Sequence, residues 1–235
     1  MALFTHSPVA SKSLRVLARL LGYPDAELRG HLAELCDALH QERALPPQRL
    51  AELDALMASL ARAAPLDVEA AYVELFDRGR STSLHLFEHV HGDSRERGPA
   101  MIDLAQTYEK AGMFLAEGEM PDFLPVVLEF TSTQPPREAR EFLAEMAHIF
   151  NAIFSALQQR GSAYACVLGA LLELAGEKAQ PVEVAAEEPI DAVWEEPVVF
   201  DGCSSKGQAK PGQPQPIHIV PNAARGPRPA QGAQA

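Results

Sequence analysis

Residues 72–99 hold most of the side chains whose types and spacing could do chemistry. They read YVELFDRGRSTSLHLFEHVHGDSRERGP, with polar and charged residues set between aromatic ones. His85 and His89 are four residues apart with Glu88 beside them, so a helix would place both imidazoles on one face, where they could hold a metal ion. The order is HLFEH rather than HExxH, and no third ligand is evident. The sequence therefore favours capping, surface hydrogen bonding or partner contact, with a metal-binding protein or metalloenzyme as the alternative.

Basic residues in the same stretch could bind an anionic group. Arg78 and Arg80 flank a glycine and follow Asp77. Two guanidinium groups beside a turn could clamp a carboxylate or a phosphate. Basic residues at a helix end also satisfy the last carbonyl groups of that helix, so both interpretations stay open. Arg95 and Arg97 could extend a basic patch on an otherwise acidic chain.

The sequence carries no pattern that would indicate an enzyme. It contains no GxSxG, phosphate-binding loop, GxGxxG or pair of catalytic carboxylates. Its three cysteines, Cys36, Cys166 and Cys203, are scattered without a CxxC pair, which is typical of a reduced chain rather than a disulfide scaffold. We therefore expect a protein that is not an enzyme and that binds no cofactor stably.

The acidic composition narrows the classes of partner. The 235 residues carry a formal net charge of −12, which disfavours nucleic acid and anionic membranes. The 47% of hydrophobic residues allows a sizeable core. No signal peptide is evident, and no uncharged apolar run approaches the ~18 residues that a membrane span requires. We expect a cytoplasmic protein with no direct membrane insertion.

The elements that must position these side chains are helices. Up to about residue 175, apolar residues recur at helical spacing, and no useful length of two-residue alternation appears. The expected helices cover roughly residues 14–21, 28–39, 47–60, 67–78, 84–91, 99–108, 121–130, 136–160 and 163–174. The sequence therefore predicts an all-α fold, with a single helical-bundle domain over residues 1–175.

A change of composition marks residues 176–235 as a tail. The segment is first acidic and then rich in Pro, Gly and Gln, so it cannot bury enough apolar surface to offset the entropy of ordering. We expect it to be largely disordered. One apolar island at 190–200, which contains Trp194, interrupts it and is typical of a docking segment, either for the chain's own domain or for a partner.

Two apolar stripes could do more than fill a core. One holds Phe123, Val126 and Val127, and the other holds Tyr72, Leu75 and Phe76. Burial is the simplest explanation for such helical spacing. However, stripes on neighbouring helices can also line a groove that takes an amphipathic helix from another protein.

Four sequence segments resemble one family, the nitrate reductase molybdenum cofactor assembly chaperones of the NarJ type, within the wider group that includes the TorD and DmsD types. The segments are LLGYP at 20–24, YVELFDRGRSTSLHLFEHVHGDSRERGPAMIDL at 72–104, PDFLPVVLEF at 121–130 and WEEPVVF at 194–200. The resemblance implies a TorD-like helical domain. It also implies a system-specific chaperone that binds the N-terminal segment of the apo catalytic (alpha) subunit of respiratory nitrate reductase.

That chaperone would keep the subunit competent for insertion of the molybdenum cofactor and iron–sulfur clusters and would delay membrane docking. It would be a monomer or a weak dimer. A metal-binding protein that uses His85, His89 and Glu88, or a structural adaptor for folded proteins, are the competing hypotheses.

A peptide groove would combine an apolar trough with a polar rim. The trough would be formed by Tyr72, Leu75, Phe76, Phe123, Val126 and Val127. The rim would be formed by Asp77, Arg78, Arg80, His85, Glu88, His89 and Asp122. A rim with histidines predicts that affinity changes as pH moves through about 6 to 7, with the sign open. In the TorD and DmsD types an Asp-His pair tends to follow the matching proline, whereas here Phe123 follows Asp122, so no role of that histidine is carried over.

Overall fold

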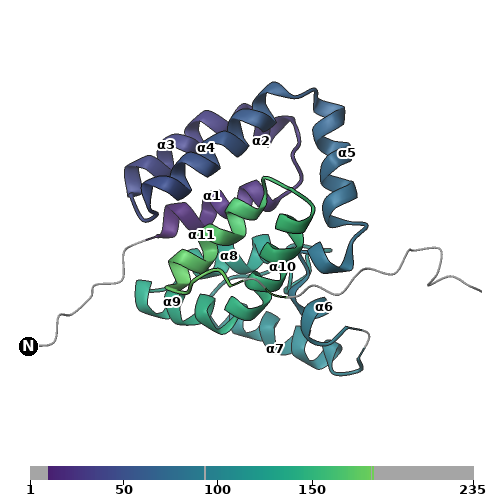
Figure 1. Ribbon diagram of the computed structural model, residues 1–235. Helices are drawn as coiled ribbons and strands as arrows, with labels where there is room; N and C mark the ends of the chain where they lie inside the picture. Colours follow the sequence, from purple (N-terminus) through teal and green to yellow (C-terminus); the bar gives the residue numbers. More distant parts are fainter. Residues whose placement is uncertain (1–9, 93, 181, 183–235) are drawn as a thin grey trace, which may run out of the picture. The chain divides into compact units, whose positions relative to one another are not determined.

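The computed structural model describes residues 10–92, 94–180 and 182, and within them the chain is helical (Figure 1). In chain order the elements are α1 (Ser11–Leu21), α2 (Ala26–Gly30), α3 (Leu32–Glu42), α4 (Pro47–Arg62), α5 (Pro65–Phe76), the 3-10 helix η1 (Arg80–Thr82), α6 (Leu86–Val90), α7 (Arg97–Lys110), α8 (Leu124–Thr133), α9 (Pro136–Glu145), α10 (Ala147–Gln159) and α11 (Ala165–Ala175). The predicted all-α fold is confirmed. None of the described helices is long and apolar enough to cross a membrane.

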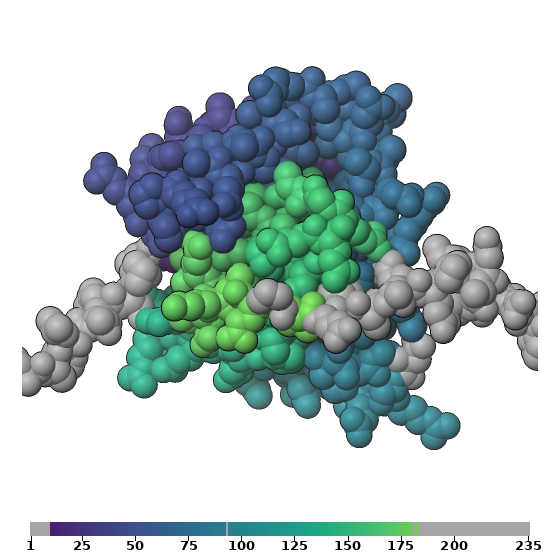
Figure 2. All heavy atoms as spheres, viewed as in Figure 1, coloured from purple at the N-terminus to yellow at the C-terminus, as the bar shows by residue number. Residues whose placement is uncertain are grey.

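The core is built around α1 and α11. Leu14, Leu17 and Leu21 on α1 are at most 2% exposed, and α1 packs against α8, α3 and α11. Helix α11 is buried along most of its length and packs against α10, α9 and α4. Figure 2 shows the surface of α4 bordering that of α10 and α11. Each fully buried leucine contributes about 1.5–3 kcal/mol, so these two helices hold most of the bundle together.

Two predicted helices are each broken in two. The helix predicted over 28–39 is interrupted at His31, with φ of −105° and ψ of 4°, and the helix predicted over 136–160 is interrupted at Met146, with φ of −92° and ψ of 0°. The apolar spacing continues through both breaks. However, α9 packs against α8 and α11, whereas α10 packs against α11, η1 and α6. One straight helix could therefore not bury the apolar residues of both halves.

Several helices begin at or next to a proline. Prolines lie in the first turn of α4, α8 and α9, where a missing N–H costs little. Helix α5 begins at Pro65, two residues before the predicted start at residue 67, so Asp67 lies in its first turn. Helix α7 begins at Arg97, so Pro99 lies within the first turn and not at its first position. An acidic residue still favours a helix start from the first turn, because it faces the positive end of the helix dipole.

The predicted tail lies almost wholly outside the described residues, and so does its island at 190–200. After α11 the described chain runs along α10, where the Gln180 N–H donates to Asn151 Oδ1 at 2.8 Å and the Val182 N–H donates to Ser155 Oγ at 3.1 Å.

Candidate functional site

Two of the motif segments meet through their backbones. An isolated antiparallel bridge pairs His85 with Phe123. The Leu124 N–H donates to the Leu84 carbonyl at 2.8 Å, and the Leu86 N–H donates to the Asp122 carbonyl at 3.0 Å. The bridge therefore fixes the start of α6 against the start of α8, and places the predicted rim residues His85 and Asp122 side by side.

The Asp122 carboxylate organises this junction. Its side chain is completely buried, and its two oxygens lie 3.3 Å from His85 Nδ1 and 3.2 Å from the Phe87 N–H, which donates to it. Arg97 Nη2 lies 3.7 Å from the second oxygen. The carboxylate thus lies at the N-terminal end of α6, where the free N–H groups favour a negative charge. A buried charge is tolerated only when it is paired and hydrogen-bonded, and here both conditions are met.

His85 connects this buried carboxylate to the surface. The hydrogen bond to Asp122 raises the pKa of His85, with a further contribution from the Asp122 and Glu88 charges, while burial and Arg97 act in the opposite direction. Its ring packs on Phe123, with the ring centroids 5.3 Å apart. The arrangement therefore favours an imidazolium that is partly exposed beside an aromatic ring.

Arg97 is the residue of this cluster that the predicted rim omitted. Its Nη2 lies 3.5 Å from Glu88 Oε1 as well as near Asp122. The sequence did point to Arg97, because it lies in the same motif as His85 and could extend a basic patch. Its pairing with Asp122 needs α7 to turn back on α6, which no local pattern shows.

The histidines of the predicted metal alternative are directed at different partners. His85 Nδ1 faces Asp122, whereas His89 Nε2 lies 2.9 Å from the Ser83 carbonyl oxygen. Within the described residues, the ligand atoms that do gather belong to Cys36, His40 and Asp54.

A pocket of about 390 Å³ opens beside the clamp formed by His85, Asp122 and Phe123. We call it the α1–α8 pocket. It is lined by Ala18, Arg19, Gly22, His85, Gly118, Glu119, Met120, Phe123, Pro125, Val126 and Glu129. Its walls combine apolar groups of α8 with His85 and the charged side chains of Arg19, Glu119 and Glu129. The pocket can therefore accept an apolar side chain with a polar flank.

A second, more apolar pocket of about 350 Å³ lies between α4, α5 and the start of α11. We call it the α4–α5 pocket. It is lined by Leu56, Ser59, Leu60, Ala63, Asp67, Val68, Ala71, Tyr72, Leu75, Ser162, Ala163 and Tyr164. Tyr72 packs against Phe76 and Tyr164, and its hydroxyl donates to the Leu21 carbonyl at 2.7 Å.

The six predicted trough residues are therefore divided between two pockets and the core. Phe123 and Val126 line the α1–α8 pocket, and Tyr72 and Leu75 line the α4–α5 pocket. The remaining two, Phe76 and Val127, belong to the hydrophobic core.

The LLGYP segment contacts both pockets. Gly22 lines the α1–α8 pocket, while Leu21 accepts the hydrogen bond from Tyr72 of the α4–α5 pocket. Tyr23 is 48% exposed and packs edge-on against Tyr72, with the ring centroids 5.7 Å apart. Tyr23 was missed as a site residue, although it lies within one of the motifs.

The basic turn of the predicted rim lies at the end of α5. Asp77, Arg78 and Arg80 are exposed, and Arg78 Nη1 lies 2.9 Å from Glu74 Oε2. A Cβ at Gly79 would come within 2.5 Å of Arg160 Nη2, which can swing away, and within 2.8 Å of Oγ1 of the buried Thr82, which leaves little room for a side chain at this position. The turn is thus held by packing, and neither pocket is lined by its charged residues.

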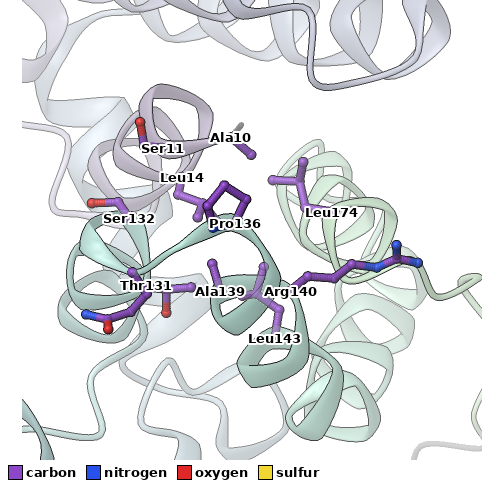
Figure 3. Close-up of a pocket in the computed structure, with 11 residues that line it drawn as sticks. Ala10, Ser11, Leu14, Thr131, Ser132, Pro136, Ala139, Arg140, Leu143 and Leu174 are labelled. Atoms are coloured by element: carbon purple, nitrogen blue, oxygen red, sulfur yellow. The ribbon is translucent and has the colours of Figure 1, made fainter. Parts of the chain in front are cut away.

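A third pocket, of about 290 Å³, contains none of the predicted site residues. Figure 3 shows it between the start of α1, the end of α8, and α9, with Leu174 of α11 at one side. Arg140 at its edge donates from Nε to the Ala175 carbonyl at 3.2 Å.

The helical domain has a fold that is also found in a solved structure. It superposes on a candidate redox enzyme maturation protein from Archaeoglobus fulgidus with a TM-score of 0.51 and 19% identity, covering 75% of this chain and 99% of that one. This likeness shows the fold.

Sequence comparison then gives the family. Residues 23–168 match the family described as nitrate reductase delta subunit. Over 193 residues the chain is 43% identical to the nitrate reductase molybdenum cofactor assembly chaperone NarJ of Escherichia coli K12, covering 78% of this chain and 82% of that protein. It is 40% identical to NarW, a proposed chaperone of the same kind in that strain, with 78% and 80% covered. The chain therefore belongs to the nitrate reductase delta subunit family. These relatives are named as assembly chaperones and not as enzymes, which confirms the prediction of a non-enzymatic chaperone.

Proposed function

We propose that this chain binds the N-terminal segment of the apo catalytic (alpha) subunit of nitrate reductase. It keeps that subunit competent for insertion of the molybdenum cofactor and delays its docking at the membrane. The names of the matched relatives support nitrate reductase as the client and cofactor insertion as the step assisted. The chaperone itself holds no cofactor stably and works as a monomer or a weak dimer.

The observation that carries the proposal is the α1–α8 pocket, whose wall is made by two motif segments joined at the Asp122 clamp. Its volume of about 390 Å³ falls within the ~300–1,000 Å³ typical of ligand pockets. Such a pocket takes side chains from one face of a docked peptide, and the peptide backbone stays outside it.

The surroundings of the pocket favour an amphipathic segment. Met120 lines the pocket and is 42% exposed, and flexible apolar groups at a surface are typical of contacts with partners. Glu119 and Glu129 line the pocket together with Arg19, so charged groups flank its apolar part. A peptide with an apolar face and a basic flank would complement the apolar part of the pocket and its carboxylates. The net charge of −12 would attract such a peptide and raise its association rate.

Calorimetric titration with a synthetic peptide of the client's N-terminal segment tests the proposal. We expect saturable binding, and Phe123→Ala should weaken it by about tenfold or more, because an aromatic contact at a pocket is worth roughly 1–2 kcal/mol or more. Leu75→Ala reports in the same way on the α4–α5 pocket, so the two variants decide which pocket takes the peptide.

Phe114→Ala is the matched control. Phe114 is also aromatic and is 76% exposed, but it lines neither pocket, so its removal should leave the dissociation constant unchanged. Equal affinity for a scrambled peptide, or unchanged binding by both pocket variants, would contradict the proposal.

A further inference from the structure

Three metal-ligating side chains gather on the α3–α4 pair, away from both pockets. Cys36 and His40 are four residues apart on α3 and therefore share a face, and Asp54 lies opposite them on α4. Cys36 Sγ lies 3.2 Å from Asp54 Oδ1, and His40 Nε2 lies 3.1 Å and 3.0 Å from the two carboxylate oxygens. All three ligand atoms lie within 4.8 Å of one another.

The two separations that involve Asp54 are close to those of a tetrahedral zinc site, and Cys36 Sγ and His40 Nε2 lie within 4.8 Å of each other. Bonds of about 2.3 Å to sulfur and about 2.0–2.1 Å to nitrogen and oxygen set the ligand atoms roughly 3.3–3.6 Å apart. The sulfur–oxygen and nitrogen–oxygen distances of 3.2 Å and 3.0–3.1 Å need to widen by only a few tenths of an ångström. Rotation of exposed side chains supplies this, because His40 and Asp54 are 48% and 38% exposed.

The arrangement does not suit a cysteine nucleophile. A nucleophilic thiol needs a base or a cation that lowers its pKa. Here His40 bonds the carboxylate and not the sulfur, and burial together with the hydrogen bond to Asp54 raises the pKa of Cys36 to about 11. The charged groups that act on the thiol are the carboxylates of Asp54 and Asp37.

We propose that Cys36, His40 and Asp54 bind one divalent zinc-class ion, with water as the fourth ligand. The thiol loses its proton to solvent as the metal–sulfur bond forms, and the imidazole binds through Nε2 with its proton on Nδ1. A thiolate and a carboxylate balance the two positive charges of the ion. The mixed sulfur, nitrogen and oxygen ligands select Zn²⁺ over Mg²⁺ or Ca²⁺, which prefer oxygen.

The ion ties α3 to α4. Because this pair packs on α1 and α11, the ion stabilises the bundle from a position that contains no trough or rim residue. Three protein ligands and one water make an exchangeable site, and peptide binding does not depend on it.

Titration of the full chain with Co²⁺, followed by competition with Zn²⁺, tests the site. We expect one equivalent to produce a thiolate-to-cobalt charge-transfer band and the intense visible bands of a tetrahedral ion, and Zn²⁺ to abolish both. Cys36→Ser should remove the charge-transfer band, and His40→Gln and Asp54→Asn should each weaken binding at least tenfold. At a hundredfold excess of Zn²⁺ over its dissociation constant, the midpoint of thermal unfolding should rise by about 5 °C or more.

His148→Gln and Cys203→Ser are the controls. His148 is another exposed histidine at a helix start, and Cys203 is a thiol of the part of the chain that the structure does not describe. Both variants should behave as wild type. No charge-transfer band, or a band that survives Cys36→Ser and disappears in Cys203→Ser, would overturn the proposal. The three ligand variants should melt as wild type without metal, so lost binding would not reflect misfolding.

Discussion

Replacement of Asp122 should destabilise the fold and the pocket wall together. In Asp122→Ala, the part-buried Phe87 N–H loses its acceptor, and His85 and Arg97 lose a shared counter-ion. A charge-assisted hydrogen bond contributes roughly 1.5–3 kcal/mol, and an unpaired buried donor costs about 1–3 kcal/mol. His85 and Arg97 are partly exposed, so water replaces part of what they lose. We expect a loss of about 2–4 kcal/mol in the free energy of unfolding.

Asp122→Asn separates shape from charge. The amide oxygen can still accept from the Phe87 N–H, so the capping of α6 survives, while the pairs with His85 and Arg97 lose their charge. The expected loss is about half that of the alanine variant. Asp103→Asn is the matched control, because Asp103 lies exposed on α7 and should change stability by less than ~0.5 kcal/mol.

The pH dependence of stability supplies an independent check. Because the folded-state pKa of His85 is raised above its usual 6.5, the stability from its pair with Asp122 is fully present below about pH 6.5. That stability is lost as pH rises through the raised pKa. Urea unfolding at several pH values should therefore show wild type losing its advantage over His85→Gln as pH rises. Asp122 variants within 0.5 kcal/mol of wild type at pH 6 would refute the reasoning.

Three further predictions follow from the packing and the rim. Gly79→Ala should cost about 1–3 kcal/mol, because its Cβ would lie 2.8 Å from the buried Thr82 Oγ1 even after the flexible Arg160 side chain has moved away. Gly98→Ala on α7, with nothing within 4 Å of its Cβ, should leave stability unchanged or raise it by up to about 1 kcal/mol, because alanine favours a helix over glycine; urea unfolding compares the two variants. Leu168→Ala should cost about 2–5 kcal/mol, since it empties a fully buried position on α11, and an unchanged thermal midpoint would contradict the packing. Peptide affinity should vary between pH 6 and 8 in wild type and less in His85→Gln, because His85 changes its charge as pH rises through a pKa that its hydrogen bond to Asp122 raises above the usual 6.5; a calorimetric dissociation constant that does not change with pH would remove this role.

Periodicity in the sequence was enough to predict the fold class and most helices. The leucines of α1 and the prolines that open α4 and α9 are local signals, and the structure follows them. The breaks at His31 and Met146 were missed because the apolar spacing runs through both positions. They are set by which neighbours each half packs against, and that information is not local.

The candidate site was likewise predicted only where the signal in the sequence is local. The motifs identified His85 and Asp122, and the bridge between their segments places them side by side. A single trough was predicted because both apolar stripes have helical spacing, yet Phe123 and Tyr72 line different pockets. Spacing reports which residues share a helix face, but it does not report which faces line the same pocket.

The clamp at Asp122 also has a consequence for the order of folding. It joins residues that are 37 positions apart, so its formation closes a long loop at an entropic cost of about 3 kcal/mol. Helices form locally and quickly, whereas contacts of this range form late. We expect the wall of the α1–α8 pocket to be among the last parts of the chain to become ordered. A copy of the protein that has not finished folding would then offer no complete pocket, so the capacity to bind a client would itself report that the chaperone is native.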